Sequence, residues 1–69
     1  MTLDAAIDIV LTDRPGMYPR EIANAINQRD LYQRKDSQPV PPGQITARVG
    51  NKAYRDRYRK DADGRIYRV

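Results

Sequence analysis

The spacing of apolar residues changes along this chain, from helical near the N-terminus to alternating near the C-terminus. Five early residues recur at the three- and four-residue intervals of an amphipathic helix. They are Leu3, Ala6, Ile7, Val10 and Leu11. From Arg55 onward the pattern has a period of two, as in a β-strand. This change of period predicts an α+β domain with helices first and a β-hairpin last.

The flanking residues predict where the first helix begins and ends. Thr2 is suited to the N-cap, and Asp4 lies in the first turn, where a carboxylate suits the positive end of the helix dipole. The turn-forming segment Asp13–Gly16 then ends the helix. We interpret this helix as structural and its Asp residues as solvated.

A second helix is predicted to begin at Pro19, a residue favoured at the first helical position. Glu21 follows Tyr18 by three residues, so its carboxylate can turn back to free N–H groups. Its expected buried stripe is Ile22, Ala25 and Ile26, closed by Leu31, with Tyr32 as a further candidate. The residue before Pro19 is biased towards an extended conformation, so Met17-Tyr18 can add a third edge to the hairpin.

A polar, Pro-rich loop over residues 33–43 precedes a third helix, predicted over residues 42–53. Ile45 and Val49 are four residues apart and are expected to face the core. Gly50 inside a helix costs about 1 kcal/mol relative to Ala. The helix therefore either continues through Gly50 or ends at Val49, and this decides whether Asn51 and Lys52 share its outer face.

The C-terminal segment predicts two strands joined by the turn residues Asp61–Gly64, with Gly64 at the left-handed position. The second strand is expected over Arg65–Val69, which is rich in β-formers. If Tyr67 and Val69 point inward, Arg68 and Ile66 point outward.

Composition excludes several classes of function. The 69 residues allow one domain and include neither Cys nor His, so disulfides, thiolate metal sites and the commonest general base are absent. We therefore expect no enzyme in this segment and no cofactor or metal. Asp61 and Asp63 begin like a Ca²⁺-binding loop, but the other ligands are missing, which favours a turn.

The location of the protein is predicted from what the sequence lacks. No apolar run approaches about 18 residues, and the N-terminus has no basic-then-apolar signal pattern. We expect an intracellular domain, cytoplasmic in a bacterium or nuclear in a eukaryote, without a membrane partner or a small-molecule substrate. We also expect it to be an N-terminal module of a larger protein.

The charges are unevenly distributed. Residues 1–28 carry two basic and four acidic side chains, whereas residues 29–69 carry eleven basic and five acidic ones. Such a split indicates a surface for a negatively charged partner. The alternative is a solvated basic surface that only keeps the chain soluble.

The order of helix, short strand, helix, loop, helix and hairpin is that of a winged helix. The sequence also resembles HARE-type winged helix-turn-helix domains. The matching residues are Thr2-Leu3, Ala6-Ile7, Val10-Leu11, Pro19–Ala23, Ile26, Leu31-Tyr32, Ile45, Ala47–Val49, Tyr54, Tyr58, Gly64-Arg65, Tyr67 and Val69. Tyr58 stands where this family has Phe, and the approach to the third helix is unusually rich in Pro. The resemblance implies DNA binding by a module attached to a larger DNA-acting protein, and sensing of base modification.

In a winged helix the third helix enters the major groove with its first residues nearest the bases. Amides of Gln44 and Asn51 can pair with adenine, and Arg48 can pair with guanine. The hydroxyl of Thr46 can reach a phosphate or bond back along the helix. The predicted DNA contacts of this helix are Gln44, Thr46, Ala47, Arg48, Asn51 and Lys52.

The basic residues of the loop and hairpin are predicted to contact phosphates, since each neutralised phosphate releases counterions. They are Arg34, Lys35, Arg55, Arg57, Arg59, Lys60, Arg65 and Arg68. Arg65, at the tip of the wing, could enter a minor groove. The alternative is ion pairing with nearby carboxylates, but Asp56, Asp61 and Asp63 are too few to neutralise the whole set.

We therefore predict a double-stranded DNA-binding module that gives specificity, including for modified bases, to an attached nuclease or regulatory domain. One alternative is a winged helix that docks on an acidic protein partner or domain, which an exposed Ile66 would support. Another is single-strand or RNA binding through stacked tyrosines, which requires Tyr54 and Tyr58 to be exposed. A core position is expected for Tyr58 and Tyr67, because the chain has no Phe or Trp.

Overall fold

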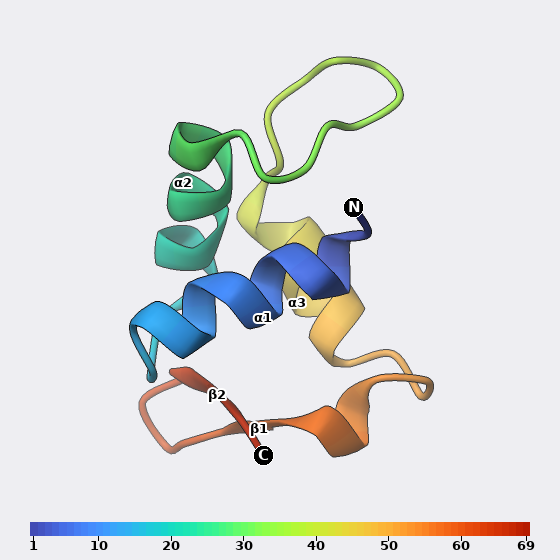
Figure 1. Ribbon diagram of the computed structural model, residues 1–69. Coiled ribbons are helices and arrows are strands. Elements are labelled where there is room, and N and C mark those ends of the chain that lie inside the picture. The colour runs from blue at the N-terminus through green and yellow to red at the C-terminus, as the bar shows by residue number, and fades with distance from the viewer.

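The computed structural model describes residues 1–69 and has three α-helices followed by a short antiparallel hairpin (Figure 1). The elements are α1 (Leu3–Asp13), α2 (Pro19–Arg29), α3 (Pro42–Val49), a 3₁₀ turn η1 (Arg55–Arg57), β1 (Tyr58–Lys60) and β2 (Ile66–Arg68). This arrangement confirms the predicted α+β domain with three helices and a C-terminal hairpin, and it is consistent with a winged-helix-like layout.

Helix α1 forms the centre of the domain and contacts α2, α3 and β2. The hydroxyl of Thr2 accepts a hydrogen bond from the Ala5 N–H at 3.3 Å, which confirms the predicted N-cap. All five residues of its predicted apolar stripe are buried. The remaining sides of α1 carry the carboxylates Asp4 and Asp8, which are only partly exposed.

Helix α2 begins at Pro19 as predicted, and the Tyr18 N–H donates to Glu21 Oε1 at 3.0 Å. Its buried residues differ from the prediction: Ala23 is buried, whereas Ala25 is only partly buried. The reason is that α2 packs against both α1 and α3, which makes its buried face wider than one stripe. The helix ends at Arg29, and its C-cap residue Asp30 has a left-handed conformation with φ of 54°.

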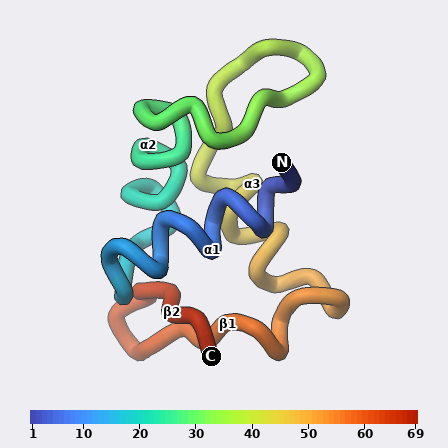
Figure 2. Tube along the Cα trace, in the orientation of Figure 1, coloured from blue at the N-terminus to red at the C-terminus, as the bar shows by residue number.

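The loop between α2 and α3 projects beyond the ends of the helices (Figure 2). It is anchored by Val40, which is buried in the core and which the sequence did not single out. The side-chain amide of Asn27 holds this residue from both sides. It accepts from the Val40 N–H at 2.9 Å and donates to the Val40 carbonyl at 3.1 Å.

Helix α3 buries Ile45 and Val49 as predicted, but it ends at Val49. Gly50 is its C-cap, and the carbonyl of Asn51 then accepts the N–H groups of both Tyr54 and Arg55. The chain therefore turns away directly after Gly50. The prediction of a helix over residues 42–53 was wrong at this end, and Asn51 and Lys52 lie in a turn.

The hairpin pairs Tyr58 with Arg68, Arg59 with Tyr67 and Lys60 with Ile66. Met17 adds a third edge, as predicted, because its N–H and carbonyl bond to the carbonyl and N–H of Ile66 at 3.2 and 2.8 Å. Residues 55–57 form the 3₁₀ turn instead of extending the first strand.

The predicted orientation of the second strand was also wrong. Ile66 is completely buried, whereas Val69 is 81% exposed and Tyr67 is partly buried. The bridge to Met17 explains this reversal, because it fixes Ile66 above the core. Tyr58 is buried beside it, as predicted.

The buried core consists of hydrophobic residues, together with Tyr58, and contains no buried charge. Each helix and the hairpin contributes to it. No helix combines the length and apolar character needed to cross a membrane.

Candidate nucleic-acid interface

Two carboxylates on α1 hold arginines that come from α3 and from the segment leading into the hairpin. Asp4 Oδ1 lies 3.3 Å from Arg48 Nη1, and Asp4 Oδ2 lies 3.3 Å from Arg57 Nη1. Arg57 also places its Nη2 on Asp8. Arg57 thus bridges both carboxylates and ties η1 to α1.

Asp8 collects two further contacts from the hairpin. Its Oδ1 accepts a hydrogen bond from the hydroxyl of Tyr58 at 2.6 Å and lies 3.7 Å from Arg68 Nε. Arg68 also donates to the hydroxyl of Thr12 at 3.1 Å. Asp4, Asp8, Arg48, Arg57, Tyr58 and Arg68 together form what we call the α1 ion cluster.

The electrostatics of the α1 ion cluster follow from its geometry. Partial burial works to raise the pKa of Asp4, but hydrogen bonds from Thr2, the backbone and Arg57 outweigh it and lower that pKa. The carboxylate of Asp8 is the main cause of the raised pKa of Arg57. Burial, followed by the hydrogen bond to Asp8, raises the pKa of Tyr58. Asp4 and Arg57 therefore remain charged, and Tyr58 remains a hydrogen-bond donor, at neutral pH.

The acids that pair with Arg48, Arg57 and Arg68 are not those nearest to them in sequence. Asp56, Asp61 and Asp63 form no ion pair, whereas Asp4 pairs with residues 44 and 53 positions away. Three of the predicted DNA contacts, Arg48, Arg57 and Arg68, therefore have intramolecular partners. The count of neighbouring acids could not reveal this, because the partners lie on the first helix.

Among the other basic residues predicted to contact DNA, one forms an ion pair and several do not. Arg34 lies 3.0 Å from Asp36 and donates to the Pro39 carbonyl at 3.4 Å, so it holds the loop. The remaining basic side chains of the C-terminal half form no ion pair. They are Lys35, Lys52, Arg55, Arg59, Lys60 and Arg65.

Three of these unpaired cations meet at one groove, of about 250 Å³, between α3 and the hairpin. Thr46, Val49 and Gly50 line it from the α3 side, and Arg55, Tyr58, Arg59, Lys60 and Ile66 line it from the other. We call it the α3–wing groove. No carboxylate lines it, and its basic residues surround apolar ones that belong to the core. It is therefore suited to a ligand that carries several negative charges.

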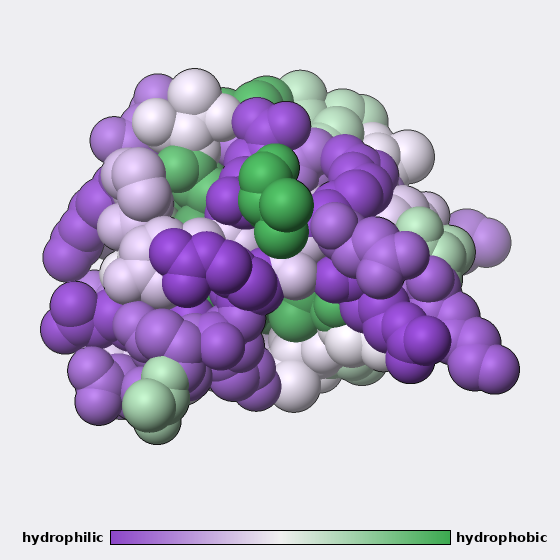
Figure 3. Space-filling view, turned by 90° about the horizontal axis from the view of Figure 1, so that it is seen from below, coloured by the Kyte–Doolittle hydropathy of each residue, from purple (hydrophilic) through white to green (hydrophobic).

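Two guanidinium groups of the hairpin stack on tyrosine rings. Arg59 lies 4.4 Å from the centre of the Tyr67 ring, and Arg65 lies 5.2 Å from that of Tyr18. Such stacking restricts a guanidinium group while leaving its N–H groups available for phosphate oxygens. Figure 3, which views the domain from the hairpin side, shows a predominantly hydrophilic surface with small hydrophobic areas.

The wing turn is held by hydrogen bonds to Asp61. Its Oδ1 accepts the N–H groups of Asp63 and Arg65 at 3.0 and 2.9 Å, and its Oδ2 accepts the Tyr67 hydroxyl at 3.2 Å. Gly64 has a positive φ of 96°, as the predicted turn requires. No three acidic side chains come together in an arrangement that could hold a metal ion.

The remaining predicted DNA contacts, on and just after α3, differ from one another in exposure and in hydrogen bonding. Gln44 is partly exposed and its amide makes no hydrogen bond within the chain. The hydroxyl of Thr46 donates to the Pro42 carbonyl at 3.4 Å, and Ala47 is exposed. Asn51 lies beyond the helix, where its Oδ1 accepts the Ala53 N–H at 2.9 Å. Lys52 is exposed in the same turn.

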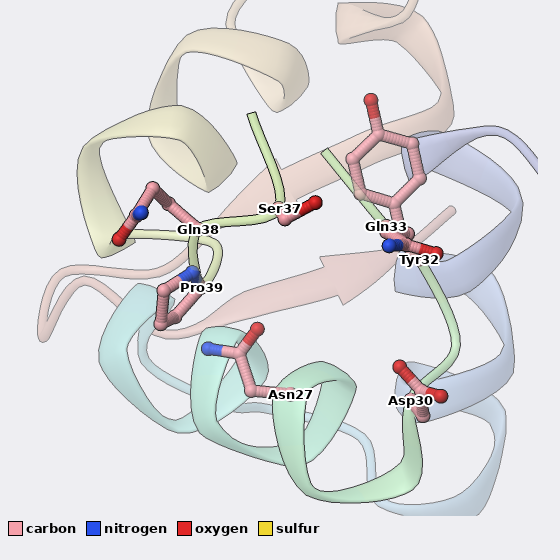
Figure 4. Close-up of a pocket in the computed structure, with 7 residues that line it drawn as sticks. All are labelled: Asn27, Asp30, Tyr32, Gln33, Ser37, Gln38 and Pro39. Carbon is pink, nitrogen blue, oxygen red and sulfur yellow. The ribbon is translucent and has the colours of Figure 1, made fainter. Parts of the chain in front are cut away.

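A separate polar hollow of about 280 Å³ lies between the end of α2 and the following loop (Figure 4). It is lined by Asn27, Asp30, Tyr32, Gln33, Ser37, Gln38 and Pro39. The only charged side chain among them is Asp30. This hollow therefore does not extend the basic surface.

Comparison with known proteins does not add to this picture, since no protein-family model, curated protein or solved structure matches the chain. The candidate interface rests on the residues themselves. Sequence reasoning missed the α1 ion cluster, for which the one available signal was the i, i+4 spacing of Asp4 and Asp8 on a helix that otherwise faces the core.

Proposed function

We propose that this chain is a winged-helix module that binds double-stranded DNA, with α3 directed at the major groove and the hairpin on the phosphate backbone. The α3–wing groove is the observation that carries this proposal. Its Arg55, Arg59 and Lys60 form no ion pair, and no carboxylate lines the groove. Each phosphate that they neutralise would release counterions and add salt-dependent affinity.

The separation of paired from unpaired cations gives further support. The carboxylates of Asp4 and Asp8 are occupied by the arginines of the α1 ion cluster, so they do not compete for the cations of the groove. The same cluster joins α3 to the hairpin through α1. A groove with fixed walls orders few side chains on binding, which limits the entropic cost of association.

The partner that best fits is a duplex. Tyr58 is buried, and Tyr54 is partly buried beneath Arg48 and Arg57, at 5.4 and 5.8 Å from their guanidinium carbons. These rings therefore offer no free platform for stacked single-stranded bases. The resemblance to HARE-type domains favours the same ligand and suggests an attached nuclease or regulatory domain, to which this module would deliver DNA.

The protein-docking alternative has less support. An exposed Ile66 would favour it, but Ile66 is buried. The exposed large hydrophobic residues are Met1 and Val69, at the two ends of the chain. They do not form the contiguous apolar patch that usually marks a protein interface.

NMR chemical-shift mapping with a short duplex at low salt tests the proposal. We expect the amide signals of Thr46, Gly50, Arg55 and Lys60 to shift in a concentration-dependent way. The outer face of α2, represented by Asn24 and Gln28, serves as the internal control and should remain unchanged. Shifts confined to α2, or no shifts at all, would contradict duplex binding through the α3–wing groove.

A further inference from the structure

Helix α3 has very few side chains left that could read bases. Ala47 and Gly43 are exposed but offer no hydrogen-bonding side chain. The Thr46 hydroxyl donates within the helix to Pro42. Asn51 has left the helix, and its Oδ1 is occupied by the Ala53 N–H. The side chains with the capacity for a two-bond contact to a base edge are therefore reduced to Arg48 and Gln44.

Arg48 is not free to read a base. Its guanidinium group lies 3.3 Å from Asp4 Oδ1 and 5.4 Å from the centre of the Tyr54 ring, so an acid and an aromatic face both hold it. The side chain of Arg48 is 29% exposed, and that of its partner Asp4 is 14% exposed. Turning Arg48 towards DNA would leave that sheltered carboxylate with one arginine fewer.

Gln44 is partly exposed, as Arg48 is, but no ion pair holds it. Its side-chain amide has no partner within the chain, and it is the third residue of α3. In helix-turn-helix docking the N-terminal residues of the recognition helix contact the base edges. A free amide at this position can donate to one group of a base and accept from its neighbour.

The residues around Gln44 include a cation that could contact the DNA backbone next to the base. Gln44 lines a hollow of about 280 Å³ together with Tyr32, Arg34, Lys35 and Asp36. Within it, Arg34 and Asp36 neutralise each other at 3.0 Å, which leaves Lys35 as the cation without an acid. Lys35 can therefore contact a phosphate beside the base that Gln44 reads.

We propose that Gln44 is the single base-reading side chain of this domain and that the base it selects is adenine. Adenine presents an acceptor, N7, next to a donor, the N6 amino group, and this pair matches a side-chain amide. All other contacts go to the backbone, so discrimination between sequences is confined to one base-pair position. This inference rests on the proposed function and adds to it which residue determines specificity.

Selection from a pool of randomised duplexes, followed by affinity measurements on the enriched duplex, tests this inference. We expect the natural chain to enrich adenine at one position and to bind that duplex on the order of tenfold more tightly than one with the base replaced. Gln44→Ala should abolish the preference while keeping the affinity for a random duplex within about twofold. Gln28→Ala, which removes an exposed amide from the outer face of α2, is the matched control and should keep the preference.

Arg48→Lys completes the design, because lysine retains the charge beside Asp4 but cannot make the two-bond contact to guanine. We expect it to leave the preference for adenine intact. Enrichment of several positions, a preference that survives Gln44→Ala, or a loss of preference in Arg48→Lys would overturn the inference. Duplex binding without any preference would also overturn it while leaving the proposed function standing, whereas no duplex binding at low salt would refute both.

Discussion

The hydroxyl of Tyr58, the first residue of β1, donates a 2.6 Å hydrogen bond to Oδ1 of Asp8 on α1. This contact joins residues 50 positions apart and ties the hairpin to the central helix. Asp8 also pairs with Arg57 and Arg68, so one carboxylate orients three side chains of the C-terminal segment. The position of the wing therefore depends on the first helix as well as on the strands themselves.

Replacing Tyr58 with Phe should lower the free energy of unfolding by about 1–2 kcal/mol, because a sheltered hydrogen bond to a charged group is lost while the ring remains packed. Urea unfolding followed by circular dichroism measures this change. Tyr67→Phe is the matched control, since its hydroxyl bonds to Asp61 on the exposed wing turn at 3.2 Å. We expect it to cost about 0.5 kcal/mol or less. Equal costs for the two variants would show that the Tyr58–Asp8 contact has no special role.

The stability of the domain should fall in acid because of Asp4. Although partial burial works to raise its pKa, hydrogen bonds from Thr2, the backbone and Arg57 lower it below the ordinary 3.8. The unfolded chain therefore binds a proton at Asp4 more readily than the folded chain does. The stability that Asp4 contributes is present above about pH 4 and is lost as the pH falls through the pKa of Asp4 in the folded chain.

Melting temperatures measured between pH 6 and pH 2 test this dependence on Asp4. We expect Asp4→Asn to melt at a lower temperature than the natural chain at pH 6. Its melting temperature should then fall less than that of the natural chain when the pH is lowered. Asp61, whose hydrogen bonds from Arg65, Tyr67 and other wing groups outweigh desolvation and lower its pKa, is unchanged in this variant, so some acid sensitivity remains. Parallel curves for the two proteins would exclude Asp4 as a source of the acid transition.

Tyr58 should resist ionisation as long as the domain is folded. Burial, followed by the hydrogen bond to Asp8, raises its pKa above the ordinary 10.0, and the nearby Arg57 only partly opposes this shift. The folded chain then keeps a proton that the unfolded chain releases, so stability present below pH 10 is lost as the pH rises further.

Absorbance of tyrosinate, recorded together with circular dichroism during an alkaline titration, tests this expectation. The ionisation of Tyr58 should coincide with the loss of helical signal, and Tyr58→Phe should lack that part of the absorbance change. Ionisation of Tyr58 with the helical signal intact would contradict the buried, hydrogen-bonded position of its hydroxyl.

Two glycines should respond to alanine in opposite directions. Gly16 has φ of +74°, and a Cβ there would lie 2.7 Å from Cε2 of Tyr67, so Gly16→Ala should destabilise the domain by about 1–3 kcal/mol. Gly43, in the first turn of α3, has no atom within 4 Å of such a Cβ, and Gly43→Ala should stabilise by about 0.4–1 kcal/mol. Urea midpoints measure both changes. A neutral Gly16→Ala would mean that Tyr67 does not pack over this turn.

The sequence predicted the parts of the fold that depend on local patterns. The stripe of α1, the start of α2 at Pro19 and the burial of Tyr58 follow from spacing, capping and the absence of other large aromatics. The sequence could not predict which residues of β2 face the core. In a strand of three residues, either Ile66 or Tyr67 could point inward without breaking the alternation. The bridge between Met17 and Ile66 decides it.

The candidate interface was less predictable than the fold, because its charges are sorted by tertiary contacts. Arg48 and Arg55 look alike in the sequence, yet Asp4 holds Arg48, whereas Arg55 lines the α3–wing groove without an acid. The burial of Val40 in the core was also not predictable from local sequence patterns. Val40 sits in a polar loop with no periodicity and is buried because Asn27 binds its backbone on both sides.

The salt dependence of duplex binding tests the central claim most directly. Arg55→Gln/Arg59→Gln/Lys60→Gln removes three cations of the groove, and Arg14→Gln/Arg20→Gln/Arg29→Gln removes three from the turn after α1 and from α2. In a plot of the logarithm of the association constant against that of salt concentration, the groove variant should have a slope smaller in magnitude by about 2–3, and the control by less than about 1. Equal slopes for the two variants, or no binding of the natural chain to any duplex at low salt, would contradict DNA recognition through the α3–wing groove.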